Sequence, residues 1–320
     1  MDPECRYIRL NSFYPSADGE HNIFYTMFIP DGEVRGVVQI AHGMCEYFER
    51  YTEFAAYLCE HGYAVCGNDH LGHGGSVNDS SEYGYFSEEN GWQNAVEDMY
   101  ALTKLAKERF SDKPYILLGH SMGSFLARAY VTRHGSMLDA AVFCGTKGEM
   151  KGIPALLAVI EMMKSVFSDN FHSRLLDKLA FGLYNAKIKP HRTRYDWLSR
   201  DEKIVDKYAK DDKCTFIFSL NGFENLMKVL WYVSDDKWFE TYPKDLPTYL
   251  IAGSADPVGN YGKGVLSVFN RLFVQNCDVE MKIYRGARHE LLNETNKQEV
   301  YEDVLSFIGS VVNDGNEDDI

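Results

Sequence analysis

The chain has 320 residues, of which 45% are hydrophobic and 25% are charged, a composition typical of a soluble globular protein. Its length is sufficient for one large α/β domain with an insertion, or for two domains. The formal net charge of −14 at pH 7 argues against a nucleic-acid-binding protein and against electrostatic docking on an anionic membrane.

Targeting signals and cysteines indicate the compartment. The first ten residues, MDPECRYIRL, lack the apolar core of a secretory signal peptide, and no apolar run reaches the length of a transmembrane helix. The seven cysteines are scattered without C-x-x-C pairs, which favours reduced thiols over a disulfide framework or a zinc site. We therefore expect a cytoplasmic protein.

Strands and helices alternate through the first 146 residues. Two antiparallel strands are predicted at residues 7–13 and 23–29, with a turn between them. Short apolar runs, of the kind that a parallel sheet buries on both faces, predict further strands at residues 36–41, 63–67, 115–118 and 138–143. Amphipathic patterns predict helices at residues 48–60 and 92–109 and directly after Ser121.

The alternation stops between residues 147 and 242, where helical patterns occur without a convincing parallel strand. It then resumes with predicted strands at 248–252 and 279–284 and predicted helices at 263–274 and 298–312. This order predicts an α/β fold with a mostly parallel central sheet flanked by helices, formed by residues 1–146 and 243–312. Residues 147–242 would form an inserted helical cap, and the acidic tail, residues 313–320, is predicted to be disordered.

The sequence PYILLGHSMGSFLARAY, residues 114–130, carries the strongest functional signal. It reads as a strand, a sharp turn with Ser121 at its apex, and a helix that starts at once, which is the arrangement of a nucleophile elbow. Gly119 and Gly123 lack side chains, so the strand and the helix can approach closely on either side of the serine. The pattern predicts a nucleophilic hydroxyl at position 121.

A serine nucleophile needs a base, and the base needs an orienting acid. Asp256 follows the predicted strand at 248–252, and His289 follows the one at 279–284. Ser121, Asp256 and His289 therefore all lie at the carboxyl ends of strands, where the ligands of such sheets bind, and in the chain order expected for this fold class. Other acids are less well placed for the orienting role, namely Asp69, Asp139 and Glu290.

Two backbone N–H groups should stabilise the oxyanion that forms when the serine attacks. One belongs to Met122, the residue after the nucleophile, and the other to Met44 in the loop that follows the strand at 36–41. We expect further substrate contacts from neighbouring residues of the core and from the cap, namely His42, Gly43, His120, Leu156 and Ile160.

Several of these motifs together resemble those of α/β-hydrolases of the lysophospholipase and monoacylglycerol lipase group. The motifs are His42-Gly43-Met44, the loop from Asn68 to Gly74, Gly119-His120-Ser121-Met122-Gly123, Asp256-Pro257 and Arg288-His289-Glu290. The resemblance implies Ser121 as nucleophile, His289 as base and Asp256 as orienting acid. It also implies Met44 and Met122 as oxyanion donors. Leu71 stands where the group usually has arginine, in a loop regarded as structural.

We therefore expect a serine hydrolase that cleaves carboxylic esters through an acyl-enzyme and requires no metal or organic cofactor. Apolar residues at 153–167 and 175–184 of the cap either pack on the core or line a channel for an acyl chain, so the expected substrate is a small ester with a lipid-like or medium-chain acyl group. His70 and His73 are spaced for a metal but lack a third nearby ligand.

Two alternatives remain open. A peptidase of the proline-iminopeptidase type, or a thioesterase, can use the same scaffold, because the fold does not fix the leaving group. An exopeptidase needs cap carboxylates to hold a substrate ammonium, and the candidates are Glu161, Asp169 and Glu224. A receptor that keeps the pocket without turnover is the second alternative.

Overall fold

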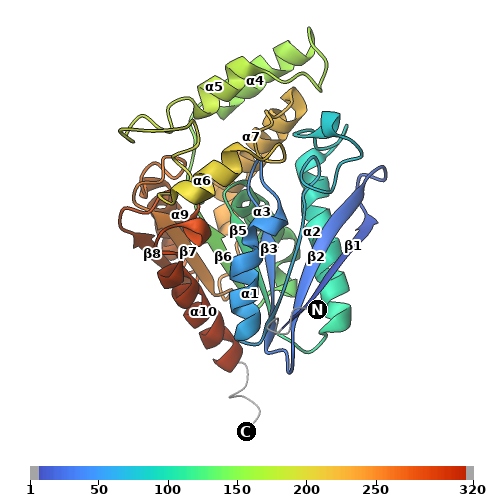
Figure 1. Cartoon of the computed structure of the whole chain (residues 1–320), viewed down its shortest axis with the longest axis vertical. Helices are drawn as coiled ribbons and strands as arrows, with labels where there is room; N and C mark the ends of the chain where they lie inside the picture. Colours follow the sequence, from blue (N-terminus) through green and yellow to red (C-terminus); the bar gives the residue numbers. More distant parts are fainter. Residues whose placement is uncertain (1–6, 315–320) are drawn as a thin grey trace.

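The computed structural model describes residues 7–314 (Figure 1). Its centre is an eight-stranded sheet in the order β1-β2-β4-β3-β5-β6-β7-β8. The strands are β1 (Tyr7–Pro15), β2 (Asn22–Pro30), β3 (Gly36–Ala41), β4 (Tyr63–Asn68), β5 (Tyr115–His120), β6 (Ala140–Cys144), β7 (Thr248–Gly253) and β8 (Val279–Tyr284). β2 pairs antiparallel with β1 and with β4, and every other pairing is parallel. The predicted mostly parallel sheet is therefore confirmed.

The burial of each strand explains why its sequence forms it. Every residue of β3, β4, β5, β6 and β7 is buried, so these strands are the continuous apolar runs expected of a sheet covered on both faces. β1 and β8 are the edge strands; β1 exposes most of its residues, and most residues of β8 are half-buried or exposed. The carboxyl ends of the parallel strands consequently point to one side of the sheet, the side on which the cap lies in Figure 1.

Helices cover both faces of the sheet. Those that flank the sheet are α1 (Thr52–Glu60), α2 (Gly91–Arg109), α3 (Met122–His134), α9 (Lys263–Val274) and α10 (Lys297–Asp314), and the short α8 (Asp236–Glu240) precedes β7. Apolar residues of α1 and α10 form one buried cluster with the sheet, and those of α2, α3 and α9 form another on the opposite face. The two clusters fix the layers of the fold.

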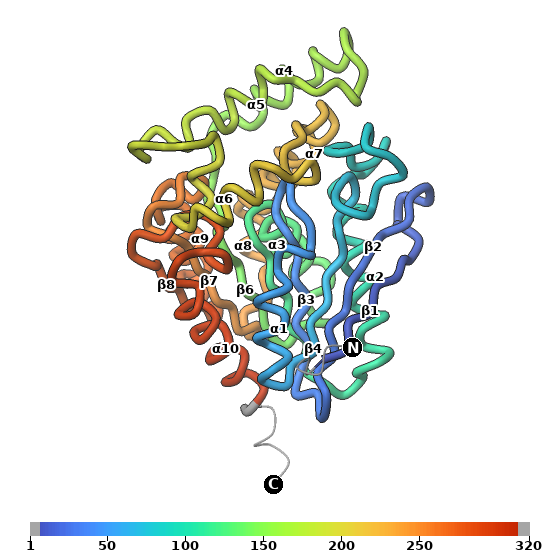
Figure 2. The backbone as a smooth tube through the Cα atoms, in the orientation of Figure 1, coloured from blue at the N-terminus to red at the C-terminus, as the bar shows by residue number. Residues whose placement is uncertain are grey.

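Residues between β6 and α8 form helices above the carboxyl ends of the strands (Figure 2). They are α4 (Ile153–Lys164), α5 (Arg174–Phe181), α6 (Glu202–Ala209) and α7 (Leu220–Ser234). α7 contacts α2 and α3 on one side and α4 on the other, so it lies between the core helices and the outer cap helices. α4 and α5 are the elements farthest from the sheet in the view of Figure 2.

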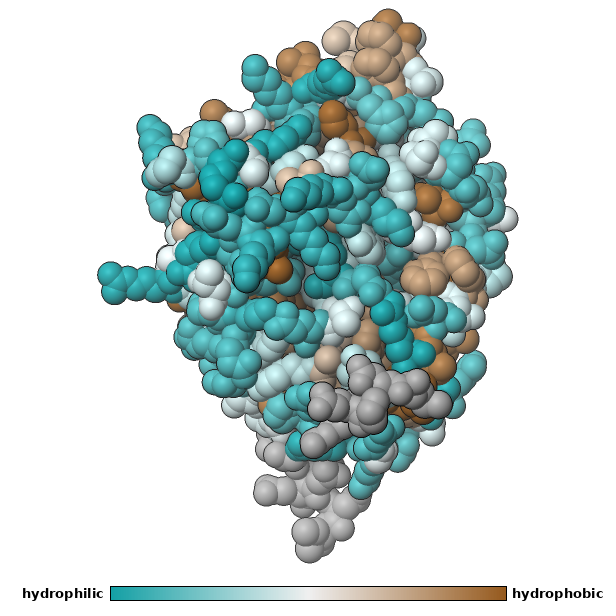
Figure 3. All heavy atoms as spheres, viewed as in Figure 1, coloured by the Kyte–Doolittle hydropathy of each residue, from teal (hydrophilic) through white to brown (hydrophobic). Residues whose placement is uncertain are grey.

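The segment of the cap that contains α4 and α5 exposes several large apolar side chains. Figure 3 shows hydrophobic residues gathered at this end of the molecule. The exposed side chains are Val159, Met162, Val166, Phe167, Phe171, Leu175, Leu179 and Leu183. Packing on the core therefore accounts for only part of the apolar sequence of the cap.

Most element boundaries agree with the sequence prediction within a few residues. The helix predicted at 48–60 begins as a 3₁₀ turn, η1 (Phe48–Tyr51), before α1. The strand predicted from residue 138 begins instead at Ala140, because residues 135–137 form a 3₁₀ turn, η3 (Gly135–Met137), after α3. Of the predicted disordered tail, 313–320, the last six residues lie outside the described residues. Within the part of the chain that is described, no helix has the length and apolar character needed to cross a membrane.

Candidate active site

The turn between β5 and α3 holds Ser121 in a conformation that L-residues rarely adopt. Its φ is 53° and its ψ is −120°, and its N–H donates to the carbonyl of Cys144 at 2.9 Å. A Cβ at Gly119 would lie 2.4 Å from the carbonyl oxygen of Gly123, and a Cβ at Gly123 would lie 2.1 Å from that of Ala41. Both glycines are therefore required for the helix to start directly against the sheet, as an elbow demands.

Asp256 and His289 meet at the ends of β7 and β8. His289 Nδ1 lies 3.0 Å from Asp256 Oδ2, and both side chains are almost completely buried. Neither atom has a hydrogen-bond partner among the described residues, so each is free to pair with the other. Asp256 Oδ1 accepts a hydrogen bond from the N–H of Val258 at 2.8 Å, which fixes the carboxylate so that Oδ2 is left for the imidazole.

The His289 loop crosses over the end of β7 because β7 ends in glycine. A Cβ at Gly253 would lie 2.2 Å from the carbonyl oxygen of Ala287 and 2.3 Å from that of Arg288. Gly145, at the end of β6, approaches the His289 ring in the same way, since its Cβ would lie 3.1 Å from Cε1. Small residues at the ends of two neighbouring strands thus admit the imidazole to the centre of the site.

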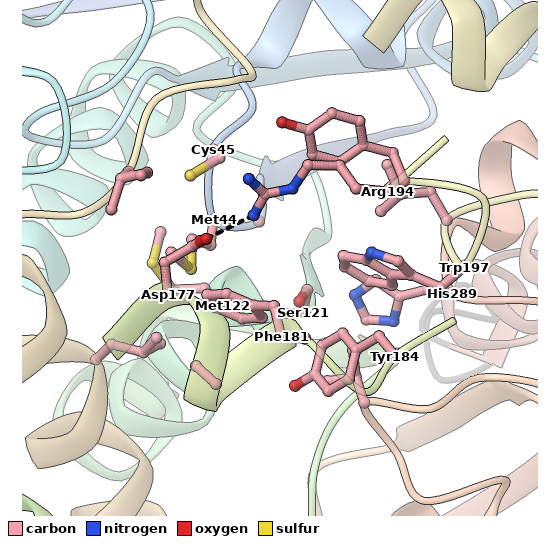
Figure 4. Close-up of a pocket in the computed structure, with 18 of the residues that line it drawn as sticks. Met44, Cys45, Ser121, Met122, Asp177, Phe181, Tyr184, Arg194, Trp197 and His289 are labelled. Carbon is pink, nitrogen blue, oxygen red and sulfur yellow. Dashed lines mark hydrogen bonds and ion pairs between the residues drawn. The ribbon is translucent and has the colours of Figure 1, made fainter. Parts of the chain in front are cut away.

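Ser121 and His289 both line the cavity that lies between the core and the cap, and Figure 4 shows both side chains facing it. Among the described residues, no hydrogen bond joins the Ser121 hydroxyl to the imidazole. Catalytic hydrogen bonds in ligand-free enzymes are often long and tighten only when substrate is bound. The arrangement thus supplies a hydroxyl, an imidazole and a buried carboxylate in one neighbourhood.

The N–H groups of Met44 and Met122 are available to a ligand. Neither donates a hydrogen bond to another described residue, and both residues line the cavity. Met122 is the first residue of α3, so its N–H also lies at the positive end of a helix dipole. A Cβ at Gly43 would lie 3.1 Å from the Ser121 Cβ, so the loop that carries Met44 packs directly against the serine.

The expected substrate-contacting residues divide into two groups. Gly43, Leu156 and Ile160 line the cavity. His42 does not line it: the side chain is fully buried, and its Nε2 accepts a hydrogen bond from the N–H of His70 at 2.8 Å. His120 reaches the cavity wall, but its Nδ1 lies 2.9 Å from the carboxylate of Glu46, so its ring is already occupied by the protein.

The loop after β4 is a structural element. Asp69 accepts hydrogen bonds from the N–H groups of Phe48 and Gly75, and Leu71 is completely buried. Burial lowers the pKa of His70, and it lowers that of His73 to about 3, so both imidazoles are neutral. The described residues contain no group of three or more potential ligands placed to hold a metal ion.

The cavity has a volume of about 1010 Å³ and is lined mainly by apolar side chains of the cap and of α7. These include Leu156, Ile160, Leu176, Phe181, Phe223, Leu226, Met227 and Leu230. Polar side chains interrupt this lining, and two of them form an ion pair: Arg194 Nη2 lies 2.6 Å from Asp177 Oδ2, a pair drawn with a dashed line in Figure 4. Apolar substrate groups can therefore be buried above Ser121.

The cap also packs directly against the imidazole of His289, which the sequence patterns did not indicate. The ring of Trp197 lies 5.2 Å from that of His289 between centroids, and Tyr184 packs edge-on against Trp197 (Figure 4). The backbone of the same cap segment accepts hydrogen bonds from the His289 loop, including one of 2.7 Å from the N–H of Glu290 to the carbonyl of Leu198. The aromatic character of Tyr184 and Trp197 was the available signal, but it resembles ordinary core packing.

Comparison with known proteins places this geometry in context. Residues 32–296 match the protein family described as serine aminopeptidase, S33. The chain is 29% identical over 306 residues to a monoacylglycerol lipase of Mycolicibacterium smegmatis, with 91% of this chain and 94% of that protein covered.

Two solved structures are similar over nearly the whole chain. One is a highly thermostable carboxyl esterase from Bacillus coagulans in complex with glycerol, with 32% identity and a TM-score of 0.89 over 95% of this chain and 99% of that one. The other is a lipase in an open form, with 27% identity and a TM-score of 0.88 over 96% of this chain and 100% of that one.

Proposed function

This chain belongs to the serine aminopeptidase S33 family of α/β-hydrolases and hydrolyses carboxylic esters, and we propose that Ser121 is its nucleophile. We further propose that the substrates are esters with a long apolar acyl group, such as monoacylglycerols. The observation that carries the proposal is a large, mostly apolar cavity that contains Ser121, His289 and two unused backbone N–H groups. The relatives named as monoacylglycerol lipase and carboxyl esterase support the same substrate class.

The proposed reaction uses these groups in turn. His289 removes the Ser121 proton as the hydroxyl oxygen attacks the ester carbonyl, and Asp256 holds the imidazole by Nδ1 and stabilises the imidazolium. The N–H groups of Met44 and Met122 donate to the oxyanion. His289 then protonates the departing alcohol, and a water molecule activated by the same imidazole hydrolyses the acyl-enzyme.

The cap is assigned the role of a lid, residues 147–242, which binds the acyl chain and excludes water. Each methylene transferred from water to the cavity contributes about 0.8 kcal/mol, or about fourfold in binding. A series of p-nitrophenyl esters therefore tests the substrate class: kcat/KM rises by up to about 15-fold per two carbons until the cavity is filled. A series that is fastest for acetate and falls steadily with chain length would contradict the assignment.

The aminopeptidase alternative lacks a suitable carboxylate. Glu224 is neutralised by Lys164 at 2.6 Å and by Lys228, and Asp169 lies 3.2 Å from Lys164. Neither these acids nor Glu161 line the cavity.

The acids that do line the cavity are each paired with a basic side chain: Glu46 with Arg50 and His120, Asp177 with Arg194, and Glu290 with Arg50. Since no unpaired carboxylate faces the cavity in the described chain, a substrate ammonium would be poorly held. We expect turnover of an aminoacyl anilide to be at least 100-fold slower than that of a matched ester.

The cysteines support a reducing, cytoplasmic location. The six in the described residues are free thiols, and all six are buried. Cell fractionation that recovered the protein outside the cytoplasm would contradict this part of the proposal.

A further inference from the structure

The sequence neighbours of three catalytic groups converge on one buried cluster of charges. Glu46 follows the oxyanion loop, His120 precedes Ser121, and Glu290 follows His289. Arg50 lies between the two carboxylates: its Nη1 is 2.7 Å from Glu46 Oε2, and its Nη1 and Nη2 are 2.7 and 2.6 Å from the two oxygens of Glu290. We call Glu46, Arg50, His120 and Glu290 the buried charge network.

Glu46, His120 and Glu290 are each also bonded to a backbone segment of the active site. Glu46 Oε1 accepts a hydrogen bond of 2.5 Å from the N–H of Gly43, the residue before the oxyanion donor Met44. His120 Nε2 lies 3.3 Å from the carbonyl oxygen of His289. Glu290 is joined by one peptide bond to His289. The oxyanion loop, the elbow and the base are thereby tied to one another across 240 residues of sequence.

The charges are almost completely removed from water. The side chains of Glu46 and Glu290 are 3% exposed and that of Arg50 is 9% exposed. Burial opposes ionisation, but the hydrogen bond and charge of Glu46 raise the pKa of His120, and the charges of His120 and Arg50 hold the pKa of Glu46 well below its usual range. The ring of Tyr208, from cap helix α6, covers the Arg50 guanidinium at 4.8 Å.

Stability alone is a poor explanation for such a cluster. Burying a guanidinium and two carboxylates has a desolvation cost that the ion pairs offset only partly, and well-packed apolar residues often stabilise a protein as much or more. A planar guanidinium with two carboxylates instead fixes distances and angles, and catalysis is sensitive to displacements of about 1 Å. We infer that Arg50 is a positioning residue, which holds the oxyanion loop and the His289 loop at fixed positions around the nucleophile. This inference rests on the proposed function of Ser121 and His289.

The first test is Arg50→Lys, which keeps the charge but cannot bond two carboxylates in a fixed plane. We expect kcat per active site, counted by titration with a fluorophosphonate, to fall about 10–100-fold while KM for a p-nitrophenyl ester changes less than threefold. Fluorophosphonate labelling should be slowed but should reach completion. Arg192→Met, which removes an exposed guanidinium 3.1 Å from Asp206, is the control and should leave all three quantities unchanged.

The second variant separates positioning from stability. Arg50→Met combined with Glu290→Met replaces the bidentate pair by apolar side chains, so it should melt within a few degrees of the wild type yet show the same loss of kcat per site. Wild-type kcat per site in either folded variant would overturn the inference, as would a loss confined to the number of titratable sites. Failure of the wild type to react with the fluorophosphonate would instead refute Ser121 as nucleophile, which is a distinguishable outcome.

Discussion

Replacing Asp256 by asparagine should stop proton transfer without disturbing the fold. In the wild type, Asp256 Oδ1 accepts from the N–H of Val258 at 2.8 Å, and Oδ2 lies 3.0 Å from His289 Nδ1. In Asp256→Asn, the amide oxygen must remain at the Oδ1 position, because the Val258 N–H needs an acceptor. The amide NH₂ then replaces Oδ2 and faces Nδ1 of the imidazole.

This orientation selects the wrong tautomer of His289. An NH₂ group can only donate, so Nδ1 becomes the acceptor and the ring proton moves to Nε2, where it blocks removal of the serine proton. The same substitution in another serine hydrolase lowers kcat about 10⁴-fold, equivalent to about 5 kcal/mol of activation free energy, and we expect a similar loss. Thermal unfolding should change little, because the substitution conserves shape.

The assay is hydrolysis of a p-nitrophenyl ester at pH 8, with the variant purified until contaminating esterases contribute less than its expected residual rate. Asp139→Asn is the matched control, since Asp139 lies at the other end of the sheet and accepts a hydrogen bond from the N–H of Tyr115 at 2.6 Å. It should retain activity within a factor of about two. Activity of Asp256→Asn within tenfold of the wild type would refute the assignment of Asp256.

Further predictions concern the elbow and a buried acid. Gly123→Ala places a Cβ 2.1 Å from a backbone oxygen of β3, so it should lower kcat/KM at least 100-fold or prevent folding. The control is Gly135→Ala, whose Cβ would have no neighbour closer than 3.5 Å, and it should leave the melting temperature and the ester hydrolysis unchanged. Burial raises the pKa of Asp98 to about 7, above its ordinary value near 4, so the stability that it contributes is present below pH 4 and is lost as the pH rises through 7. Asp98→Asn should therefore lose less unfolding free energy than the wild type between pH 4 and 8 in urea titrations, and parallel curves for the two proteins would contradict this reasoning.

Much of the fold follows from local sequence. The apolar runs of β3 and β7 are bounded by polar or glycine-containing turns, so their extent could be predicted within a residue. The triad candidates could be predicted because parallel strands bring their carboxyl ends together, which makes sequence position after a strand a guide to spatial position. Ser121, Asp256 and His289 needed no tertiary information beyond that rule.

The buried charge network could not be predicted in the same way. Arg50 and Glu290 are 240 residues apart, and nothing in either local sequence identifies the other as its partner. His42 was assigned to the substrate because it adjoins the oxyanion loop, but side chains alternate in direction there, and its ring points into the loop after β4. Packing of Trp197 on His289 also depends on how the cap returns to the core, which local patterns do not specify.

The most direct measurement of the central claim is the intact mass of the protein after reaction with diisopropyl fluorophosphate, followed by peptide mapping. The wild type should gain one diisopropylphosphoryl group on Ser121 and lose ester hydrolysis in proportion, and Ser121→Ala should gain none and have no activity above background. Modification at a different residue, or full ester hydrolysis by Ser121→Ala, would contradict the account.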